Sequence, residues 1–219
     1  VSKMPQSKDE GGMPSIGLTF SVLAKNKKYV LGVLSQILYV GAQIMCWTYI
    51  YQYAEGIGMD SVTAGYYQMA AFVLFTVGRA VGTYMLRFLS PGKLLANFAI
   101  LAMICVAGTI WIEGMIGLYC LVGISFFMSL MFPTIYGIAL NDLTEEQSKV
   151  GSAGLIKAIV GGALMPKLQG MIIDAGGSGV ADTTIMGVSE VNFSFILPLL
   201  CFVYIAWYGM NVFKNYENS

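Results

Sequence analysis

The sequence predicts an all-α membrane protein with six transmembrane helices. Of its 219 residues, 57% are hydrophobic and only 11% are charged, and the mean hydropathy is +0.70. A soluble domain has about a quarter of its residues charged, so this deficit indicates that lipid surrounds most of the chain. A membrane-spanning helix needs about 20 predominantly apolar residues, and six segments come close to or exceed that length. None shows the strict alternation that a lipid-facing β-barrel strand requires.

The expected spans follow one another through mostly short connections. Residues 1–28 read as a cytoplasmic linker, rich in proline, glycine and charge, followed by a juxtamembrane segment, and 214–219 as a cytoplasmic tail. Residues 29–213 between them form the six-helix unit. Its spans are expected at 29–54, 62–86, 94–112, 114–141, 150–173 and 191–213.

The distribution of basic residues predicts the orientation of these spans. With the N-terminus inside, the inner segments carry nine Lys and Arg residues, whereas the outer segments 55–61, 113 and 174–190 carry none. Basic residues concentrate on the cytoplasmic side of membrane proteins. Both termini are therefore expected in the cytoplasm. Six spans behind a basic, linker-like start suggest half of a larger carrier, since twelve-helix transporters are built from two six-helix halves, each made of two three-helix repeats.

Several classes of function are disfavoured by the composition. The formal net charge is zero, which gives no indication of a nucleic-acid partner. The chain has no histidine, and its four cysteines lie in apolar runs, so neither a metal site nor a disulfide framework is expected. No motif indicates an organic cofactor, and no nucleophile–base pair indicates an enzyme. The first residue is Val1 and no signal peptide opens the chain, which suggests a fragment.

Polar side chains in the first span suggest a ligand pathway. At helical periodicity Gln36, Gln43 and Trp47 share one face. Two amides and an indole suit a polyhydroxylated ligand, because amides both donate and accept hydrogen bonds and the indole offers a flat ring and an N–H. Alternatively, the two amides form hydrogen bonds between neighbouring helices.

The fourth span repeats this pattern around a proline. Ser125, Ser129, Phe132 and Tyr136 fall within a narrow sector of the helix. Pro133 has no N–H to donate to the carbonyl of Ser129, which predicts a kink and a free acceptor. The helix either lines a cavity and gates it, with Ser129 and Tyr136 facing the substrate, or is simply bent around a packed tyrosine. Pro166 and Pro198 raise the same possibility in the last two spans.

Three basic residues lie inside expected spans. Arg79 is interpreted as an inner-gate charge or as a contact to helix-end carbonyls. Lys157 is expected to face the cavity or a carboxylate, because an ammonium costs about 2.5–3.5 kcal/mol at the centre of a bilayer. Lys167 lies two helical turns before Asp174 on the same face, which predicts an ion pair near the outer boundary.

Four segments together resemble one family of carriers. They are "GAQIMCWTYIYQYAE", "GRAVGTYMLRFLSPGKLLA", "FFMSLMFPTIYGIAL" and "KVGSAGLIKAIVGGALMPKLQG". They resemble the C-terminal half of fucose permease-like sugar–proton symporters of the major facilitator superfamily. Gly82, Arg87, Gly92 and Lys93 match the glycine and basic positions of the superfamily's loop motif, whereas Leu86 stands where many members carry aspartate.

The resemblance implies secondary active transport of a monosaccharide, such as fucose, glucose or galactose, by proton-coupled alternating access in the bacterial inner membrane. It implies an N-terminal six-helix half as partner, which carries most of the proton-coupling carboxylates of the family. This chain would supply one wall of the sugar cavity through Gln36, Gln43, Trp47, Ser129 and Tyr136. The rival interpretations are a carrier for a solute other than a sugar and a non-transporting membrane scaffold.

Overall fold

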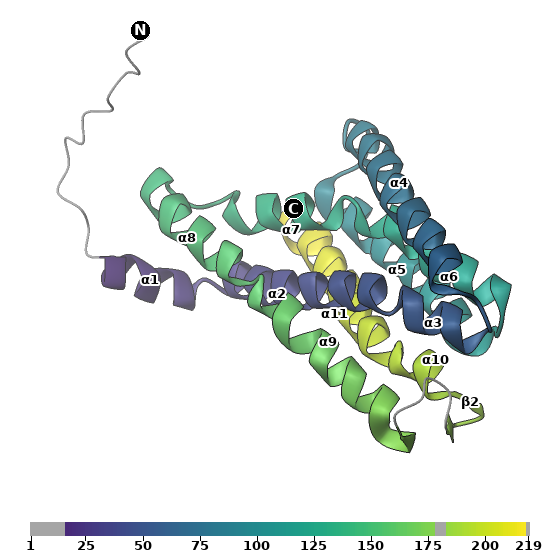
Figure 1. Ribbon diagram of the computed structural model, residues 1–219. Coiled ribbons are helices and arrows are strands. Elements are labelled where there is room, and N and C mark those ends of the chain that lie inside the picture. The colour runs from purple at the N-terminus through teal and green to yellow at the C-terminus, as the bar shows by residue number, and fades with distance from the viewer. Residues whose placement is uncertain (1–15, 178–182, 218–219) are drawn as a thin grey trace, which may run out of the picture.

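The computed structural model describes residues 16–177 and 183–217, and within them the chain is mainly helical (Figure 1). The first half contains α1 (Ile16–Lys25), α2 (Lys27–Thr48), α3 (Ile50–Gly56), α4 (Ser61–Met85) and α5 (Pro91–Trp111). The second half contains α6 (Met115–Met128), α7 (Met131–Leu140), α8 (Glu145–Lys157), α9 (Val160–Ile173), η1 (Asp174–Gly176), the hairpin β1 (Thr184–Ile185) and β2 (Val188–Ser189), α10 (Glu190–Ser194), α11 (Ile196–Val212) and the short π-helix η2 (Phe213–Glu217). The expected residues 1–15 of the linker and 218–219 of the tail lie outside the described residues.

Five helical stretches are long and apolar enough to cross a membrane. They are Lys27–Gly56, Pro91–Trp111, Met115–Leu140, Glu145–Gly176 and Glu190–Asn215. Each corresponds to one of the expected spans. The remaining expected span, 62–86, is the 25-residue helix α4, which is long enough but is not among the five. Gln68 and Arg79 lower its hydropathy, so a sixth span is not established by length and composition.

Hydrogen bonds accepted by its N-cap residue, Asp60, fix where α4 begins. The carboxylate of Asp60 accepts hydrogen bonds from the hydroxyl of Thr63, at 2.7 Å, and from the backbone amides of Val62 and Thr63. The hydroxyl bond from Thr63, followed by the amide bonds, lowers the pKa of Asp60 below its ordinary value. A lowered pKa means that this cap stabilises the helix at neutral pH and is lost as the pH falls through that pKa.

Most of the spanning stretches are interrupted rather than continuous. Tyr49 separates α2 from α3, residues 129–130 separate α6 from α7, and Phe195 separates α10 from α11. The kink expected from Pro133 therefore appears as a break one turn before the proline. Pro198 instead lies in the first turn of α11, where no intrahelical donor is needed.

Pro166, where a kink was possible, does not interrupt its helix. Pro166 is inside the continuous helix α9, and the interruption in that stretch comes earlier, between Lys157 and Val160. The carbonyls of Leu155 and Ile156, just before this break, accept hydrogen bonds from the amides of Ala158 and Ile159. Pro166 has no N–H to donate to the carbonyl of Gly162, yet α9 continues through it without a second break. The carbonyl of Pro166 also accepts a hydrogen bond from Tyr49, at 2.7 Å.

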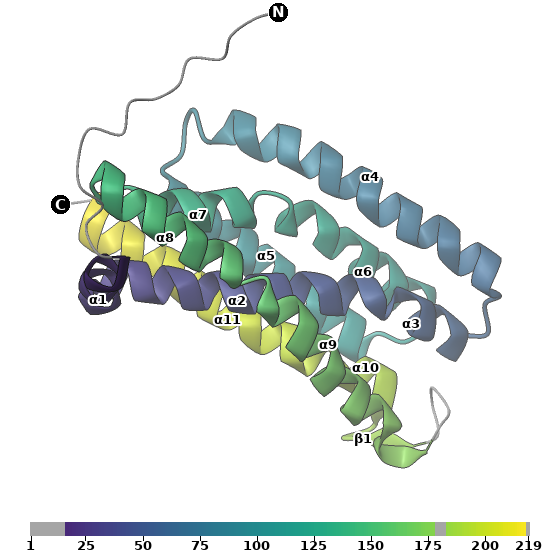
Figure 2. The ribbon, with the colours of Figure 1, turned by 60° about the vertical axis from the view of Figure 1, so that its left-hand side comes forward.

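The helices are arranged around α2. It packs against α7, α9 and α11, while α5 packs against α6 and α11. Helix α4 contacts α3 and α6, and α4 and α9 lie at opposite edges of the bundle in both views (Figures 1 and 2). The fully buried core contains large side chains from α2, α3 and α11, including Tyr39, Tyr53, Phe202 and Tyr208.

One end of the bundle is fastened by polar contacts close to the start of α2. The ammonium of Lys28, with only 9% of its side chain exposed, lies 2.6 Å from a carboxylate oxygen of Asp142, just after α7. The hydroxyl of the neighbouring Tyr29 donates to the carbonyl of Gly151 in α8, at 2.9 Å. These contacts hold together α2, the end of α7 and the start of α8.

Close approach of α2 and α9 depends on Gly161. A Cβ atom at this position would collide with the carbonyl oxygen of Ile37. By contrast, a Cβ atom at Gly123 in α6 would meet nothing within 4 Å. Since small residues let membrane helices approach one another closely, these two glycines differ in what they contribute to packing.

We expect Gly161→Ala to destabilise the protein by about 1–3 kcal/mol, the usual cost of overpacking, because α9 must move away from α2. Gly123→Ala is the matched control and should not destabilise, since alanine favours helix and meets open space. Thermal unfolding in detergent, followed by the loss of the monodisperse peak in size-exclusion chromatography, measures both. Equal stability of the two variants would contradict the close contact inferred at Gly161.

Candidate functional site

Trp47 is held in place by side chains from two other helices. Its indole N–H donates a hydrogen bond to the hydroxyl of Ser125 in α6, with 3.1 Å between the atoms. Its ring centre lies 5.0 Å from that of Phe72 and 5.1 Å from that of Phe75, both in α4, with interplanar angles of 89° and 74°. Edge-to-face pairs of this kind are favourable. The half-buried indole is therefore fixed in orientation, and its N–H is already used within the protein.

Arg79 connects the aromatic group formed by Trp47, Phe72 and Phe75 to the break between α6 and α7. Its Nε donates to the carbonyl of Ser129 at 3.2 Å, and its guanidinium lies 5.0 Å from the ring centre of Phe75. The carbonyl of Ser129 is available because Pro133, four residues later, has no N–H. The free acceptor expected from the sequence is thus present, and of the two roles considered for Arg79 the contact with a helix-end carbonyl is observed.

Two further side-chain hydrogen bonds satisfy the end of α6. The hydroxyl of Tyr39 in α2 donates to the carbonyl of Met128 at 3.0 Å. The hydroxyl of Ser129 donates to the carbonyl of Phe126 at 2.7 Å, and Ser129 is fully buried. The last carbonyls of a helix lack intrahelical donors, and these two hydroxyl groups supply donors in their place. Ser129 therefore acts at the break and presents no exposed hydroxyl to a ligand.

An aromatic surface continues from the break along α7. The rings of Phe132 and Tyr136 stack with an interplanar angle of 12° and 6.5 Å between their centres. Phe132 also meets Tyr39 edge-on, with 6.2 Å between ring centres. Tyr136 is half-buried, so part of its ring is accessible. Aromatic faces from α2, α4 and α7 thus surround the α6–α7 break.

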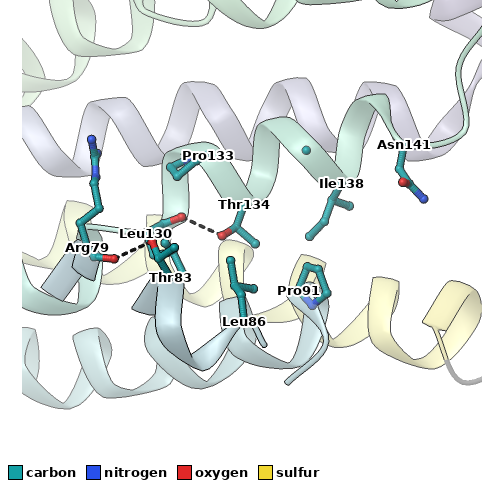
Figure 3. A pocket seen from close by; sticks show the side chains of 10 residues that line it. Arg79, Thr83, Leu86, Pro91, Leu130, Pro133, Thr134, Ile138 and Asn141 are labelled. Carbon is teal, nitrogen blue, oxygen red and sulfur yellow. Dashed lines mark hydrogen bonds between the residues drawn. The ribbon is translucent and has the colours of Figure 1, made fainter. Parts of the chain in front are cut away.

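A cavity of about 570 Å³ opens beside this break, between the C-terminal part of α4, α7 and the start of α5 (Figure 3). Its polar lining includes Arg79, Thr83, Thr134 and Asn141. The hydroxyls of Thr83 and Thr134 donate to backbone carbonyls of their own helices, at 2.7 and 2.8 Å, and keep lone pairs with which to accept. The volume lies within the range of about 300–1,000 Å³ found for small-molecule sites.

The structure separates the three polar residues expected on one face of α2. Trp47 and Gln43 are half-buried, whereas Gln36 is fully buried, and neither of its amide atoms has a partner among the described residues. Helices α7 and α11 pack on this part of α2, and a Cβ atom at Gly32, one turn earlier, would collide with Ala139 and Tyr208. Gln36 is therefore not accessible together with Trp47 in this structure.

The remaining charged residues lie away from the aromatic group. Lys157, Lys167 and Asp174 are exposed, and the expected Lys167–Asp174 ion pair is not formed. Seven helical residues span about 10 Å, so a bridge would require two extended side chains. At an exposed site the entropy lost in ordering them offsets the attraction, which explains the absence of this pair from the described part of the chain.

Sequence reasoning did not identify the partners of Trp47. Helical spacing groups Ser125 with Ser129 and Tyr136, but the contacts of Ser125, Phe72 and Phe75 with Trp47 cross between helices. The signal available was their helical spacing, which groups residues on one helix and cannot pair faces of different helices.

Comparison with known proteins shows which transporters this chain is similar to. No protein-family model matches the chain. The chain is 49% identical over 215 residues to the L-fucose-proton symporter of Haemophilus influenzae, covering 98% of this chain and 48% of that protein. It is homologous to half of a fucose permease-like transporter. The Escherichia coli L-fucose-proton symporter is 32% identical over 193 residues, covering 87% of this chain and 41% of that protein.

The chain is also similar to a glucose/galactose transporter and to a solved transporter structure. A glucose/galactose transporter of Brucella abortus is 32% identical over 184 residues, covering 83% of this chain and 41% of that protein. The crystal structure of the major facilitator superfamily transporter FucP in the outward conformation matches with a TM-score of 0.84 and 29% identity, over 96% of this chain and 49% of that one. The chain spans about half the length of the relatives it matches.

The comparisons confirm the resemblance expected from the four sequence segments. They support an integral membrane protein of the major facilitator superfamily, and because these relatives are transporters, they also support the expectation that the chain is not an enzyme. The structural match covers nearly the whole chain, including the helices that carry Trp47, Arg79 and the α6–α7 break.

We expect Arg79→Gln to lower the free energy of unfolding by about 1 kcal/mol, because the carbonyl of Ser129 loses a charge-assisted donor at a partly exposed site. Arg87→Gln is the control, since Arg87 is also exposed and its guanidinium lies 5.8 Å from the ring centre of Tyr84, but it donates to no carbonyl among the described residues. Chemical unfolding in mild detergent, followed by tryptophan fluorescence, measures the difference. An Arg79→Gln protein as stable as Arg87→Gln would show that this hydrogen bond contributes nothing.

Proposed function

We propose that this chain is the C-terminal six-helix half of a proton-coupled monosaccharide transporter of the bacterial inner membrane. The observation that carries the proposal is the 49% identity with an L-fucose-proton symporter over 98% of the chain. The basic, linker-like residues ahead of α2 support a position after another half. Helix α4 is proposed as the remaining span, because its 25 residues reach about 37 Å, more than the hydrocarbon core of about 30 Å.

The groups around Trp47 support a sugar as the substrate. With its N–H donated to Ser125, the indole can offer a ligand only its ring surface, which suits the C–H face of a pyranose. Gln43, half-buried one turn earlier on α2, has an amide that can both donate to and accept from hydroxyl groups. We propose that these two residues, with Tyr136, form this half's wall of the sugar pathway.

The two other residues expected at the sugar receive different roles. Ser129 is proposed to support the wall through the α6–α7 break rather than to bind sugar, because its hydroxyl donates to Phe126. Gln36 is proposed to reach the pathway only when α7 or α11 moves, since it is covered in this structure. A group that changes its exposure in this way suits alternating access, in which one site is opened in turn to the two sides of the membrane.

Proton coupling is assigned to the absent half. In the described spanning stretches, the carboxylates lie at the ends, at Glu55, Glu145, Glu146, Asp174 and Glu190. A proton relay through a membrane requires ionisable groups at depth. We therefore propose that the N-terminal half supplies these groups and that this half contributes substrate contacts and rigid-body movement.

The orientation follows from the charge asymmetry. We propose that both termini lie in the cytoplasm, because the basic residues between the expected spans fall at one end and the acidic outer segments carry none. The Lys28–Asp142 ion pair supports this arrangement, since it joins two segments assigned to the same side.

Uptake of radiolabelled L-fucose, D-glucose and D-galactose tests the proposal, using proteoliposomes of the full-length protein that contains this chain, with and without a pH gradient. We expect Trp47→Ala to reduce uptake about tenfold through loss of the ring contact, and Trp47→Phe to retain most of it. Trp207→Ala is the control, because Trp207 is exposed on α11 and its ring pairs with Tyr204.

Two results would contradict the proposal. If the uptake rate were the same with and without a pH gradient, proton symport would be excluded. If none of the three sugars were taken up, a carrier for another solute or a non-transporting scaffold would be favoured. If Trp207→Ala reduced uptake as strongly as Trp47→Ala, the effect would reflect general damage to the bundle rather than a lost contact with the sugar.

A further inference from the structure

A second cavity, distinct from the one beside α4, lies between α1, α2 and the α8–α9 junction. Its volume is about 580 Å³. The walls are mainly apolar, with Phe20 from α1, Val33 and Leu34 from α2 and Val160 from α9. Phe20, Leu34 and Val160 are 41–52% exposed, so the groove is open at the surface of the bundle. Where such a groove faces the bilayer, it is occupied by hydrocarbon.

Lys157 introduces a charge into this groove. Of the described residues that line it, only Lys157 is charged. Its side chain is exposed and makes no hydrogen bond or ion pair with the residues that the structure describes. An ammonium beside hydrocarbon is costly unless it reaches the interface or meets an anion. The groove thus combines an apolar channel with an unmatched positive charge.

The position of Lys157 along the bundle brings it within reach of lipid headgroups. Tyr29, which also lines the groove, donates to Gly151, and the adjacent Lys28 pairs with Asp142 at the polar end of the bundle. Lys157 lies six residues beyond Gly151, about 9 Å further along α8. A lysine side chain at this depth can extend towards the headgroup region while its methylene groups stay in apolar surroundings.

Basic residues at the same end increase the attraction for anions. Lys25 ends α1 and Lys27 begins α2, and both are exposed. Helix α1 contacts both α2 and α8 and contributes Phe20 and Ala24 to the groove, so Lys25, which ends α1, lies near it. Pockets of basic residues between helices on the cytoplasmic side bind anionic lipid headgroups.

From this geometry we propose that the groove between α1, α2 and α8 binds an anionic phospholipid, with its phosphate at Lys157 and one acyl chain along Val33, Leu34 and Val160. A phospholipid supplies both parts that the groove matches, a negative headgroup and an alkyl chain. A soluble phosphate would meet the ammonium but leave the apolar walls uncovered. The lipid would also hold α1 against the bundle, because Phe20 and Ala24 of α1 form part of the groove.

Lipid retention by the purified full-length protein tests this site. The protein is reconstituted in nanodiscs of phosphatidylcholine alone or mixed equally with phosphatidylglycerol, and tightly bound lipid is counted by native mass spectrometry after release into detergent. We expect retention of phosphatidylglycerol over phosphatidylcholine, and Lys157→Ala should lower that preference about fivefold. Lys157→Arg should preserve it. Lys167→Ala is the matched control, since Lys167 is exposed on α9 but does not line the groove.

A second variant separates lost binding from failed folding. Val33→Trp fills the apolar part and leaves Lys157 in place, so it should also release the lipid while keeping the monodisperse elution of the parent protein. Preference for phosphatidylglycerol that is unchanged in both variants would overturn the proposal. So would equal thermal stabilisation by soluble glycerol phosphate, which would indicate a free-anion site. Cross-linking from position 157 to another segment of the full-length protein, with no lipid retained, would assign the groove to a protein contact.

Discussion

The architecture depends on satisfying the backbone where α6 gives way to α7. Inside a bilayer no water replaces a missing hydrogen bond, so every freed carbonyl must find a partner within the protein. Pro133 frees the carbonyl of Ser129, and the end of α6 frees that of Met128. Arg79 from α4 and Tyr39 from α2 supply the donors. One interruption thus requires three helices to meet at one level of the bundle.

The contacts at this break also position Trp47, which we propose as part of the wall of the sugar pathway. Arg79 lies against Phe75, Phe75 meets Trp47, and Trp47 donates to Ser125 on the helix that Arg79 also contacts. The contacts form a closed circuit through α2, α4 and α6. A ligand that displaced Trp47 would therefore also disturb Ser125 and Phe75, so substrate contact and the geometry of the break are physically linked.

Features set by single residues or by local spacing could be predicted from the sequence. The lack of an N–H at Pro133 predicts the free acceptor at Ser129, and apolar length predicts the spanning stretches. The burial of Gln36 could not be predicted, because periodicity defines a face of α2 but not which neighbour covers it. The same limit hid the contact between Trp47 and Ser125, residues 78 positions apart. The spacing of Lys167 and Asp174 predicted an ion pair, but both side chains are exposed, and the entropy lost in ordering them offsets their attraction.

The modest hydropathy of α4 bears on how the chain enters the membrane. A helix that contains Gln68 and Arg79 partitions less readily from the translocon into lipid than its neighbours do. In the folded chain α4 packs mainly against α3, which precedes it, and α6, which follows it, while Phe72 and Phe75 also meet Trp47 of α2. During biosynthesis α4 would then depend on the later helix for retention, and the N–H groups of Arg79 would find the Ser129 carbonyl only after α6 and α7 had emerged. Insertion of α4, which we propose as the sixth span, would thus be coupled to the order of synthesis.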